Sequence, residues 1–263
     1  MPFRVLERTG ATAPHATGML AAPTIEGAAV SFDGEAFVDD MRDELQRSGR
    51  TLDQADWVKR VEQGEATKYD MVAWARQHYY GVTYHTRRLL SVWVGRIPYD
   101  MTDGVIENIA EEVLGTVSKS GYGHLHWLQE FTRALGAPDE VVTRATPNVD
   151  AIASESFLFN LAHQRPWYEL TFGGILAIEN QIPPAYIKAV AGFKANYSDI
   201  LQPDDYAFHT IHITVDEDHG GHVGAFAEEY LDTDEKRRSA RAAYFAGAEL
   251  TRRCWDNLSD CTW

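Results

Sequence analysis

The sequence predicts an all-α protein built from a single helical domain. Apolar residues recur with a helical period from residue 34 almost to the C-terminus, in segments bounded by capping residues, glycines and prolines. Strand alternation, hairpin turn pairs and internal repeats are not found. Hydrophobic residues make up 44% of the 263 residues, which suffices for one sizeable core. Residues 34–263 are therefore expected to form one helical domain. Residues 1–33, rich in Ala, Gly, Pro and Thr, are expected to be an irregular N-terminal arm.

The expected helices of the first half of the chain begin and end at ordinary capping signals. Gly49, Gly64 and Gly136 suit the C-terminal ends of helices, and Pro98 stops another. Thr51 or Asp53 caps the second helix, and Thr67 opens the third. The expected helices are 34–49, 53–64, 67–98, 102–117 and 124–136.

The second half follows the same rules, with prolines placed where helices start. Pro166 occupies the first position of a helix, where proline is tolerated, and the segment that follows it is apolar enough to run through the core. Thr233 and Asp234 cap the last helix. The expected helices are 138–144, 148–164, 166–181, 185–193, one that starts at Pro203, and 233–258.

Composition and charge exclude several classes of function. A formal net charge of −15 is opposite to the basic face that binds nucleic acid and to the basic segments that dock on anionic membranes. No run of 18 apolar residues predicts a transmembrane helix, and MPFRVLERTG is too polar for the core of a signal peptide. The two cysteines, Cys254 and Cys261, match no zinc spacing. A reducing, cytoplasmic location is expected.

The segment FHTIHITVDEDHGGH, residues 208–222, offers a candidate metal site. His212, Asp216 and His219 are spaced four and three apart, so on a helix they share one face. His209 and His222 lie one turn before and after this triplet. A single histidine on an amphipathic helix is most often a packed side chain. Burying Asp216 beside two histidines, however, would be costly without a partner, and a cation that accepts nitrogen and oxygen ligands supplies one. The HExxH motif of zinc proteases and the ExxH pairs of ferritin-like proteins are absent.

Further ligands have to come from other helices, where ionisable groups interrupt apolar segments. Glu179 lies in GGILAIENQIPP, and a carboxylate buried there would need a compensating charge; otherwise it is an exposed residue at a helix end. His124 heads HLHWLQEF, and His126 would face another direction. Glu111 and Glu112 both lie in VIENIAEEVLG, where one of the two is expected to be solvated.

The ordered segments AEEVLG, GHLHWLQEFTRALG, LAIENQIPPAY and HTIHITVDEDH resemble those of the haem-oxygenase-like di-iron oxidases. These are relatives of thiaminase II and pyrroloquinoline-quinone synthase that bind two irons instead of haem. The resemblance covers roughly residues 35–235 and implies a haem-oxygenase-like helical bundle. It assigns metal-binding roles to Glu112 (or Glu111), His124, Glu179, His212, Asp216 and His219.

The resemblance also implies a reaction. One iron would take Glu112, His124 and His212, and the other Glu179, Asp216 and His219, with O2 as co-substrate and a peroxide held between the two irons. The expected enzyme is a non-haem di-iron oxidase or oxygenase. Enzymes of this kind act on small amino-acid-like or fatty substrates. The size and acidity of the chain favour an amino acid, with lysine or a modified lysine as the specific candidate. Desaturation or oxidative C–C cleavage is expected, and N-oxygenation is the alternative within the family. A homodimer and an external electron donor are further expectations.

Two readings compete with a di-iron enzyme. A metal-free, thiaminase-like or cofactorless relative is disfavoured because thiaminase-type chemistry needs a nucleophilic cysteine in the core, and both cysteines lie near the C-terminus. A non-catalytic helical interaction domain would leave the histidines simply packed. The charges available to hold a small substrate are on Arg87, Arg88, Glu155, His163 and Glu169.

Overall fold

The computed structural model describes residues 32–144, 146–219 and 223–258. Within these ranges, the side chains of residues 81, 82, 84–87 and 214–219 lie outside the description. The chain divides into two compact units, Met1–Ser31 and Phe32–Trp263, and everything that follows concerns the second unit. The predicted N-terminal arm therefore lies almost wholly outside the described residues.

The described part of the chain is all-α, as predicted, and contains no strand. Its α-helices are α1 (Gly34–Ser48), α2 (Asp56–Glu62), α3 (Lys68–His78), α4 (Tyr84–Trp93), α5 (Thr102–Leu114), α6 (His124–Ala134), α7 (Glu140–Thr143), α8 (Val149–His163), α9 (Trp167–Leu170), α10 (Ala177–Glu179), α11 (Ile182–Asn196), α12 (Ala207–His219), α13 (Val223–Tyr230) and α14 (Asp234–Asp256). Short 3₁₀ turns η1 (Leu52–Gln54), η3 (Tyr99–Met101) and η5 (Pro203–Tyr206) connect some of them. Two π-helical turns complete the set, η2 (Tyr79–Thr83) and η4 (Thr171–Leu176).

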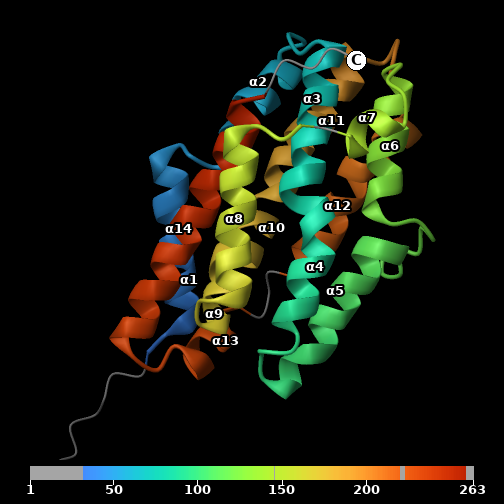
Figure 1. Ribbon diagram of the computed structural model, residues 1–263. Coiled ribbons are helices and arrows are strands. Elements are labelled where there is room, and N and C mark those ends of the chain that lie inside the picture. The colour runs from blue at the N-terminus through green and yellow to red at the C-terminus, as the bar shows by residue number, and fades with distance from the viewer. Residues whose placement is uncertain (1–31, 145, 220–222, 259–263) are drawn as a thin grey trace, which may run out of the picture. The chain divides into compact units, whose positions relative to one another are not determined.

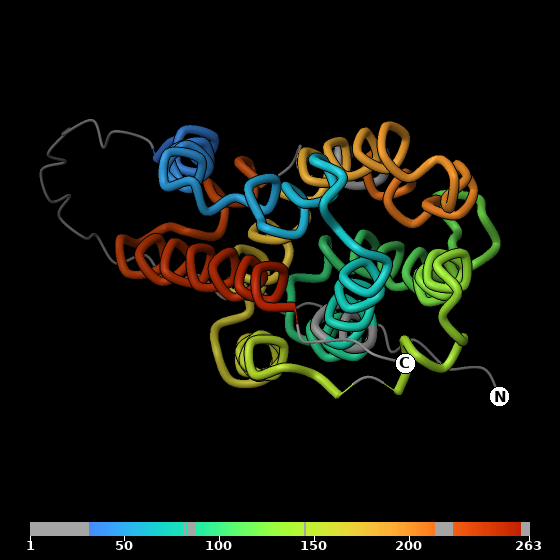
Figure 2. The backbone as a smooth tube through the Cα atoms, turned by 90° about the horizontal axis from the view of Figure 1, so that it is seen from above, coloured from blue at the N-terminus to red at the C-terminus, as the bar shows by residue number. Residues whose placement is uncertain are grey.

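The helices form a bundle around a central column. Figure 1 shows α3 and α4 following one another as that column, with α8 and α14 to one side and α5 and α6 to the other. In the view from above, α14 runs between α1 and α8 (Figure 2). Helices α11 and α12 pack against each other, and α14 packs against η4. None of the described helices combines the length and apolarity needed to cross a bilayer.

Most helix ends agree with the predicted capping residues. Thr67 and Asp70 form a capping box at the start of α3, and the Thr233 hydroxyl accepts the Lys236 N–H at the start of α14. Gly49 ends α1 in the left-handed conformation, at φ 68°.

The predicted cap at Thr51 or Asp53 is wrong. Helix α2 begins only at Asp56, with Ala55 as its N-cap. The Asp53 carboxylate instead accepts a 2.7 Å bond from Lys188 on α11. A long-range ion pair therefore outweighs the local capping preference.

The predicted long helix 67–98 and the predicted helix 166–181 are each interrupted by a π-helical turn, η2 and η4 respectively. At η4, the backbone of Gly173 lies against α14: a Cβ on Gly173 would come within 2.8 Å of the Ala243 carbonyl oxygen. A π-helical turn holds one residue more than an α-helical turn. Here it occurs where the chain packs against a distant helix, a contact that a single sequence does not reveal. Such turns are rare and occur frequently at functional sites.

The core is aromatic where α2, α3, α11, α12 and α14 meet. Trp57 stacks on Trp74 with ring centroids 4.5 Å apart, and Trp255 meets both rings edge-on. His209 of α12 is fully buried between these rings and Tyr186. This histidine is therefore a packed core residue, the ordinary reading of a lone histidine on a helix.

Candidate metal centre

A cavity of about 80 Å³ lies inside the bundle, beside the central column. It has room for several waters or a small organic molecule. Its lining residues come from α3, η2, α4, α5, α6, α8, α9, η4, α10, α11 and α12. They are His78, Thr83, Leu89, Leu90, Glu112, His124, Leu158, Leu170, Gly174, Ile175, Ile178, Glu179, Ile182 and His212.

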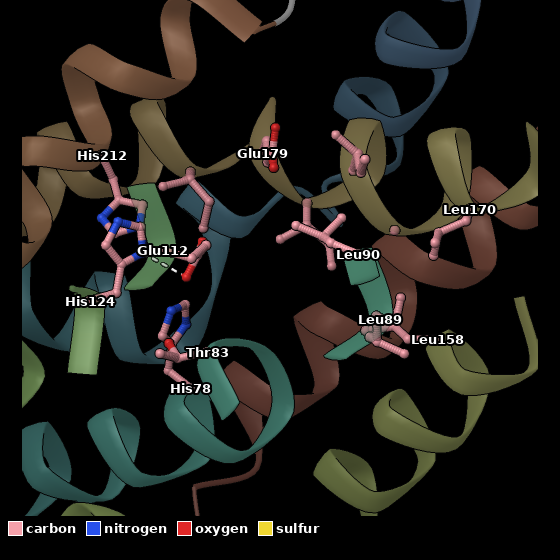
Figure 3. Close-up of a pocket in the computed structure, with 14 residues that line it drawn as sticks. His78, Thr83, Leu89, Leu90, Glu112, His124, Leu158, Leu170, Glu179 and His212 are labelled. Carbon is pink, nitrogen blue, oxygen red and sulfur yellow. Dashed lines mark ion pairs between the residues drawn. The ribbon is translucent and has the colours of Figure 1, made fainter. Parts of the chain in front are cut away.

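The cavity has two chemically different sides. Figure 3 shows a polar side, formed by His78, Thr83, Glu112, His124 and His212. Opposite it lies a leucine side, formed by Leu89, Leu90, Leu158 and Leu170, and Glu179 lies between the two sides. Reactive groups therefore face a hydrocarbon wall, an arrangement typical of a site for a small molecule.

The imidazole of His124 lies between two carboxylates of α5. Its Nδ1 is 3.0 Å from Oε2 of Glu112, and its Nε2 is 3.8 Å from Oε1 of Glu111. Burial alone would lower the pKa of His124, but the charges of Glu112 and Glu111 outweigh it and raise that pKa to about 10. Without a metal, the imidazole is thus protonated and lies between two carboxylates.

Glu111 and Glu112 differ in their surroundings. Glu111 is buried, and its Oε2 accepts the backbone N–H groups of Val117 at 2.6 Å and Ser118 at 3.0 Å. Burial raises its pKa, but the neighbouring imidazole of His124 and the hydrogen bonds from Ser118 and Val117 bring it down to about 2. Only Glu112 lines the cavity. Of the two carboxylates, Glu112 is therefore the one that a molecule or ion in the cavity could contact, whereas Glu111 lies behind His124.

The turn between α5 and α6 brings these side chains together. Gly115 ends α5 in the left-handed conformation, at φ 61°, where a side chain would be strained. At Gly123, a Cβ would come within 2.5 Å of the Val113 carbonyl oxygen, so only glycine allows the start of α6 to pack this closely on the end of α5. His124 is the next residue and so lies against Glu112.

His212 of α12 faces the same cavity with a defined tautomer. Its Nδ1 donates a 2.7 Å hydrogen bond to the Phe208 carbonyl oxygen, which leaves Nε2 without a proton and able to bind a metal. Burial and the nearby charge of His124 lower the pKa of His212 well below its usual value. The ring centroids of His124 and His212 are 4.4 Å apart.

Glu179, the last residue of α10, is the fourth predicted ligand on the cavity wall. Its Oε1 accepts a 3.3 Å hydrogen bond from the Asn108 side chain on α5. The helix α12 extends to His219, but the side chains of Asp216 and His219 lie outside the described residues. His222 is likewise not described.

The donors present fit a transition metal, although the described side chains form only part of a ligand set. Three buried atoms, Oε1 of Glu111, Oε2 of Glu112 and Nε2 of His124, make no well-directed hydrogen bond to the described residues and meet one another only as ion pairs. Such atoms are costly unless they are partnered, and imidazole with carboxylate is a donor set that iron accepts. No three His, Cys, Asp or Glu side chains within the described ranges lie close enough together to hold a metal ion.

A second hollow of about 260 Å³ lies next to the cavity and shares Thr83 and Glu112 with it. Tyr79, His126 and Gln129 are among its other lining residues. His126, the predicted competitor of His124, thus lines this hollow and not the cavity.

Sequence reasoning missed His78 and Thr83 and offered other residues for substrate binding. Neither residue is among the candidates named from the sequence, and the π-helical turn η2 that follows His78 cannot be predicted from a single sequence. Of the charged residues suggested from the sequence, Arg88, Glu155, His163 and Glu169 do not line the cavity. The side chain of Arg87 is outside the described residues.

Comparisons with known proteins agree with this fold. A family model described as an iron-containing redox enzyme matches residues 72–252. The 4-aminobenzoate synthase of Nitrosomonas europaea is 26% identical over 200 residues, which cover 74% of this chain and 78% of that protein.

Solved structures of distant relatives share the fold. A CADD-like protein of unknown function from Nostoc punctiforme superposes with a TM-score of 0.65 at 15% identity, over 86% of this chain and 96% of that one. A TenA homologue from Pyrococcus furiosus superposes with a TM-score of 0.63 at 15% identity, over 84% of this chain and 98% of that one. A domain with a heme oxygenase-like fold from Shewanella denitrificans superposes with a TM-score of 0.61 at 18% identity, over 84% of this chain and 88% of that one.

The family match spans more than half of the chain, and the helical bundle and the resemblance noted from the motifs agree with it. The chain belongs to the iron-containing redox enzyme family and has its haem-oxygenase-like fold.

Proposed function

We propose that this protein is a non-haem di-iron oxidase or oxygenase that uses O2 to oxidise a small amino-acid-like substrate. One observation carries the proposal. Four of the six predicted ligands, from four helices that are separate in the sequence, line a single buried cavity: Glu112, His124, Glu179 and His212. Asp216 and His219 on α12 would complete two ligand sets.

Charge balance supports two divalent ions at this centre. Two ferrous ions bring four positive charges into a buried site. Glu112, Glu179 and Asp216 offset three of them, and Glu111, held behind His124, offsets the fourth. Bound iron would supply the capacity to reduce O2.

The chain's own residues prepare the site for that chemistry. Glu111 orients His124, and the Phe208 carbonyl fixes the tautomer of His212. The leucine side excludes water from one half of the cavity. For a desaturation, the substrate loses two electrons and two protons, and an external donor supplies two further electrons. Together with two protons from solvent, these reduce O2 to two waters.

An amino-acid-like substrate, with lysine or a modified lysine as the specific candidate, agrees with a cavity that combines acidic groups and a hydrocarbon wall. The related protein of Nitrosomonas europaea is named for 4-aminobenzoate, a small molecule that carries an amino and a carboxyl group. N-oxygenation uses the same centre and differs in the product. A homodimer with no nucleic-acid or membrane partner completes the proposal.

The decisive experiment loads the protein anaerobically with Fe(II), measures iron per chain, and follows O2 uptake with lysine and other amino acids. Two irons per chain and substrate-dependent O2 uptake are expected. Asp216→Ala is expected to abolish O2 uptake and to leave the helical circular-dichroism signal largely intact. Glu107→Gln, at an exposed carboxylate of α5, is the matched control and is expected to behave like the wild type. Absence of bound iron and of O2 uptake would favour the interaction-domain reading instead.

A thiaminase-like reaction is disfavoured by the position of Cys254. This thiol is buried in α14 and does not line the cavity. Burial and the charge of Asp150 raise its pKa to about 12, which keeps it protonated and unreactive. Cys261 lies outside the described residues.

A further inference from the structure

His78 lines the cavity with a buried imidazole ring, one nitrogen of which has no hydrogen-bond partner among the described residues. It is the last residue of α3 and only 4% exposed, and Nδ1 of its ring is buried without a hydrogen-bond partner. Trp74 stacks on the ring at 5.1 Å, and Phe208 meets it edge-on at 5.3 Å, so the ring is held in place by packing. Figure 3 shows His78 on the polar side, near Glu112. A buried imidazole without a partner is costly, and a molecule in the cavity can supply that partner.

His209 shows what a purely structural histidine looks like in the same core. Its two ring nitrogens are also buried without partners, and aromatic rings surround it. However, His209 is fully enclosed and does not line the cavity. His209 is therefore a control for His78: a buried imidazole in the same aromatic core that has no access to the cavity.

The neighbours of His78 indicate what it would bind. Thr83, five residues further along the chain in η2, adds a hydroxyl to the same side. Among the residues that the structure describes, no lysine or arginine lines the cavity, whereas the carboxylates of Glu112 and Glu179 do. A hydroxyl or amino group therefore suits this position better than an anion. The leucine side offers only hydrocarbon to the remainder of the molecule.

We propose that His78 and Thr83 bind the hydroxyl or amino group of an aliphatic substrate, while the leucine side takes its hydrocarbon chain. This inference rests on the proposed function in treating the cavity as the substrate site. Beyond that function, it specifies how the substrate is oriented in the cavity and names His78 and Thr83 as the residues that orient it.

The test uses the full-length, iron-free protein and two probes of equal length, 1-butanol and 1-chlorobutane, titrated by calorimetry. Both place a hydrocarbon chain against the leucine side, but only 1-butanol carries a hydroxyl group. The wild type is expected to prefer 1-butanol by about threefold to tenfold, the usual net contribution of one hydrogen bond. His78→Phe and Thr83→Val are each expected to reduce this preference and to leave 1-chlorobutane binding nearly unchanged.

His78→Gln, which retains a hydrogen-bonding group, is expected to restore part of the preference, and His209→Phe is expected to leave it as in the wild type. Equal preference in the wild type and His78→Phe would overturn the inference, as would loss of the preference in His209→Phe. Because these titrations need neither iron nor O2, they remain informative whether or not the iron-loaded protein consumes O2.

Discussion

At the scale of single residues, the centre depends on adjacent positions having different tasks. Glu111 and Glu112 are neighbours on α5, about 100° apart around the helix, so both reach His124 but only Glu112 reaches the cavity. The sequence predicted the pair but could not choose between its members, because the choice depends on the backbone N–H groups of Val117 and Ser118. These groups bind Glu111 only after the α5–α6 turn has formed.

This division of roles predicts different losses of iron affinity. Glu111→Gln keeps a hydrogen-bonding side chain but removes the charge behind His124, and is expected to weaken Fe(II) binding about 10- to 100-fold. Glu112→Gln removes a ligand and is expected to lower the stoichiometry as well. Anaerobic Fe(II) titration measures both quantities. If the two variants exchange these phenotypes, Glu111 is the ligand.

The raised pKa of His124 predicts a pH dependence. Its pKa is about 10 in the metal-free protein, so at pH 7 the ring is protonated, and iron has to displace a proton to bind there. The affinity for Fe(II) is therefore expected to rise about tenfold per pH unit between pH 6 and 8. This rise would level off only as the pH approaches 10. Titration in buffers of different ionisation enthalpy should detect the released proton.

His124→Gln removes the group that titrates and should flatten this dependence. His126→Gln, a histidine outside the cavity, should not. An affinity in the wild type that does not change with pH would contradict the assignment of His124 as a ligand.

At the scale of elements, helix boundaries could be predicted where local chemistry determines them. The capping box of Thr67 and Asp70 and the glycine end of α1 are of this kind. The π-helical turns could not be predicted, because packing between distant segments accompanies them. His209 and His212 make the same point. They lie one turn apart on α12, yet one packs in the aromatic core and the other lines the cavity. Spacing predicted that α12 carries a ligand face, but not where that face begins.

Two glycines, one at the contact between α14 and η4 and one on the open surface of α5, are expected to respond in opposite ways to substitution by alanine. At Gly247, a Cβ would come within 1.9 Å of the Gly173 carbonyl oxygen, so Gly247→Ala forces the elements apart. It is expected to destabilise the protein by about 1–3 kcal/mol. At Gly104 in α5, a Cβ meets nothing within 4 Å, and Gly104→Ala is expected to stabilise by about 0.5–1 kcal/mol.

Urea unfolding of the iron-free protein measures both changes. Because η4 leads directly into α10, Gly247→Ala should also weaken Fe(II) binding through Glu179, whereas Gly104→Ala should not. A neutral Gly247→Ala would show that the close approach is not needed.

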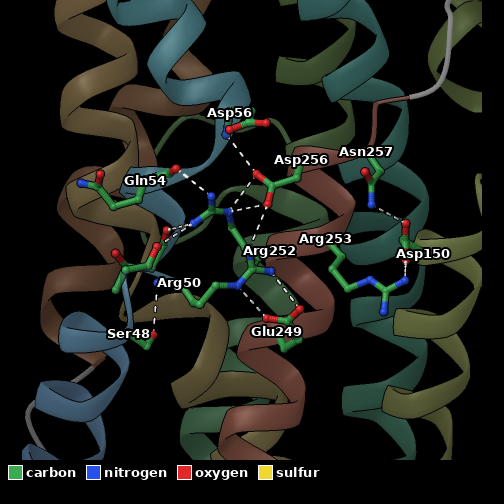
Figure 4. Close-up of polar contacts among 12 residues, drawn as sticks. Ser48, Arg50, Gln54, Asp56, Asp150, Glu249, Arg252, Arg253, Asp256 and Asn257 are labelled. Carbon is green, nitrogen blue, oxygen red and sulfur yellow. Dashed lines mark hydrogen bonds and ion pairs between the residues drawn. The ribbon is translucent and has the colours of Figure 1, made fainter.

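At the scale of the whole molecule, Arg252 joins the last helix to the segment between α1 and α2. Its side chain is 6% exposed and donates to the backbone oxygens of Gly49, Thr51 and Gln54, while Asp256 balances its charge (Figure 4). All-α architecture followed from helical periodicity, but this long-range connection did not. An arginine near the end of a charged helix looks like a surface residue in the sequence.

Arg252→Met is expected to destabilise the fold by about 3–5 kcal/mol, because it leaves three carbonyl groups without their donor and, among the described residues, Asp256 with only Arg50 to balance its charge. Arg42→Met is the matched control. Arg42 pairs with Asp39 on the surface, where such pairs contribute about 0–1 kcal/mol. Chemical denaturation of the two variants provides the comparison, and equal midpoints would show that the Arg252 connection is dispensable.

The two π-helical turns have a consequence for how this scaffold diversifies. Each holds one residue more than an α-helical turn would, so gain or loss of a single codon there changes the phase of the helix that directly follows by about 100°. At η4, such a step would rotate Glu179 off the cavity wall. At η2, it would place a neighbouring residue on the polar side of the cavity instead of Thr83. Relatives with this architecture can thus acquire different chemistries by one-residue insertions, while the aromatic interior stays as it is.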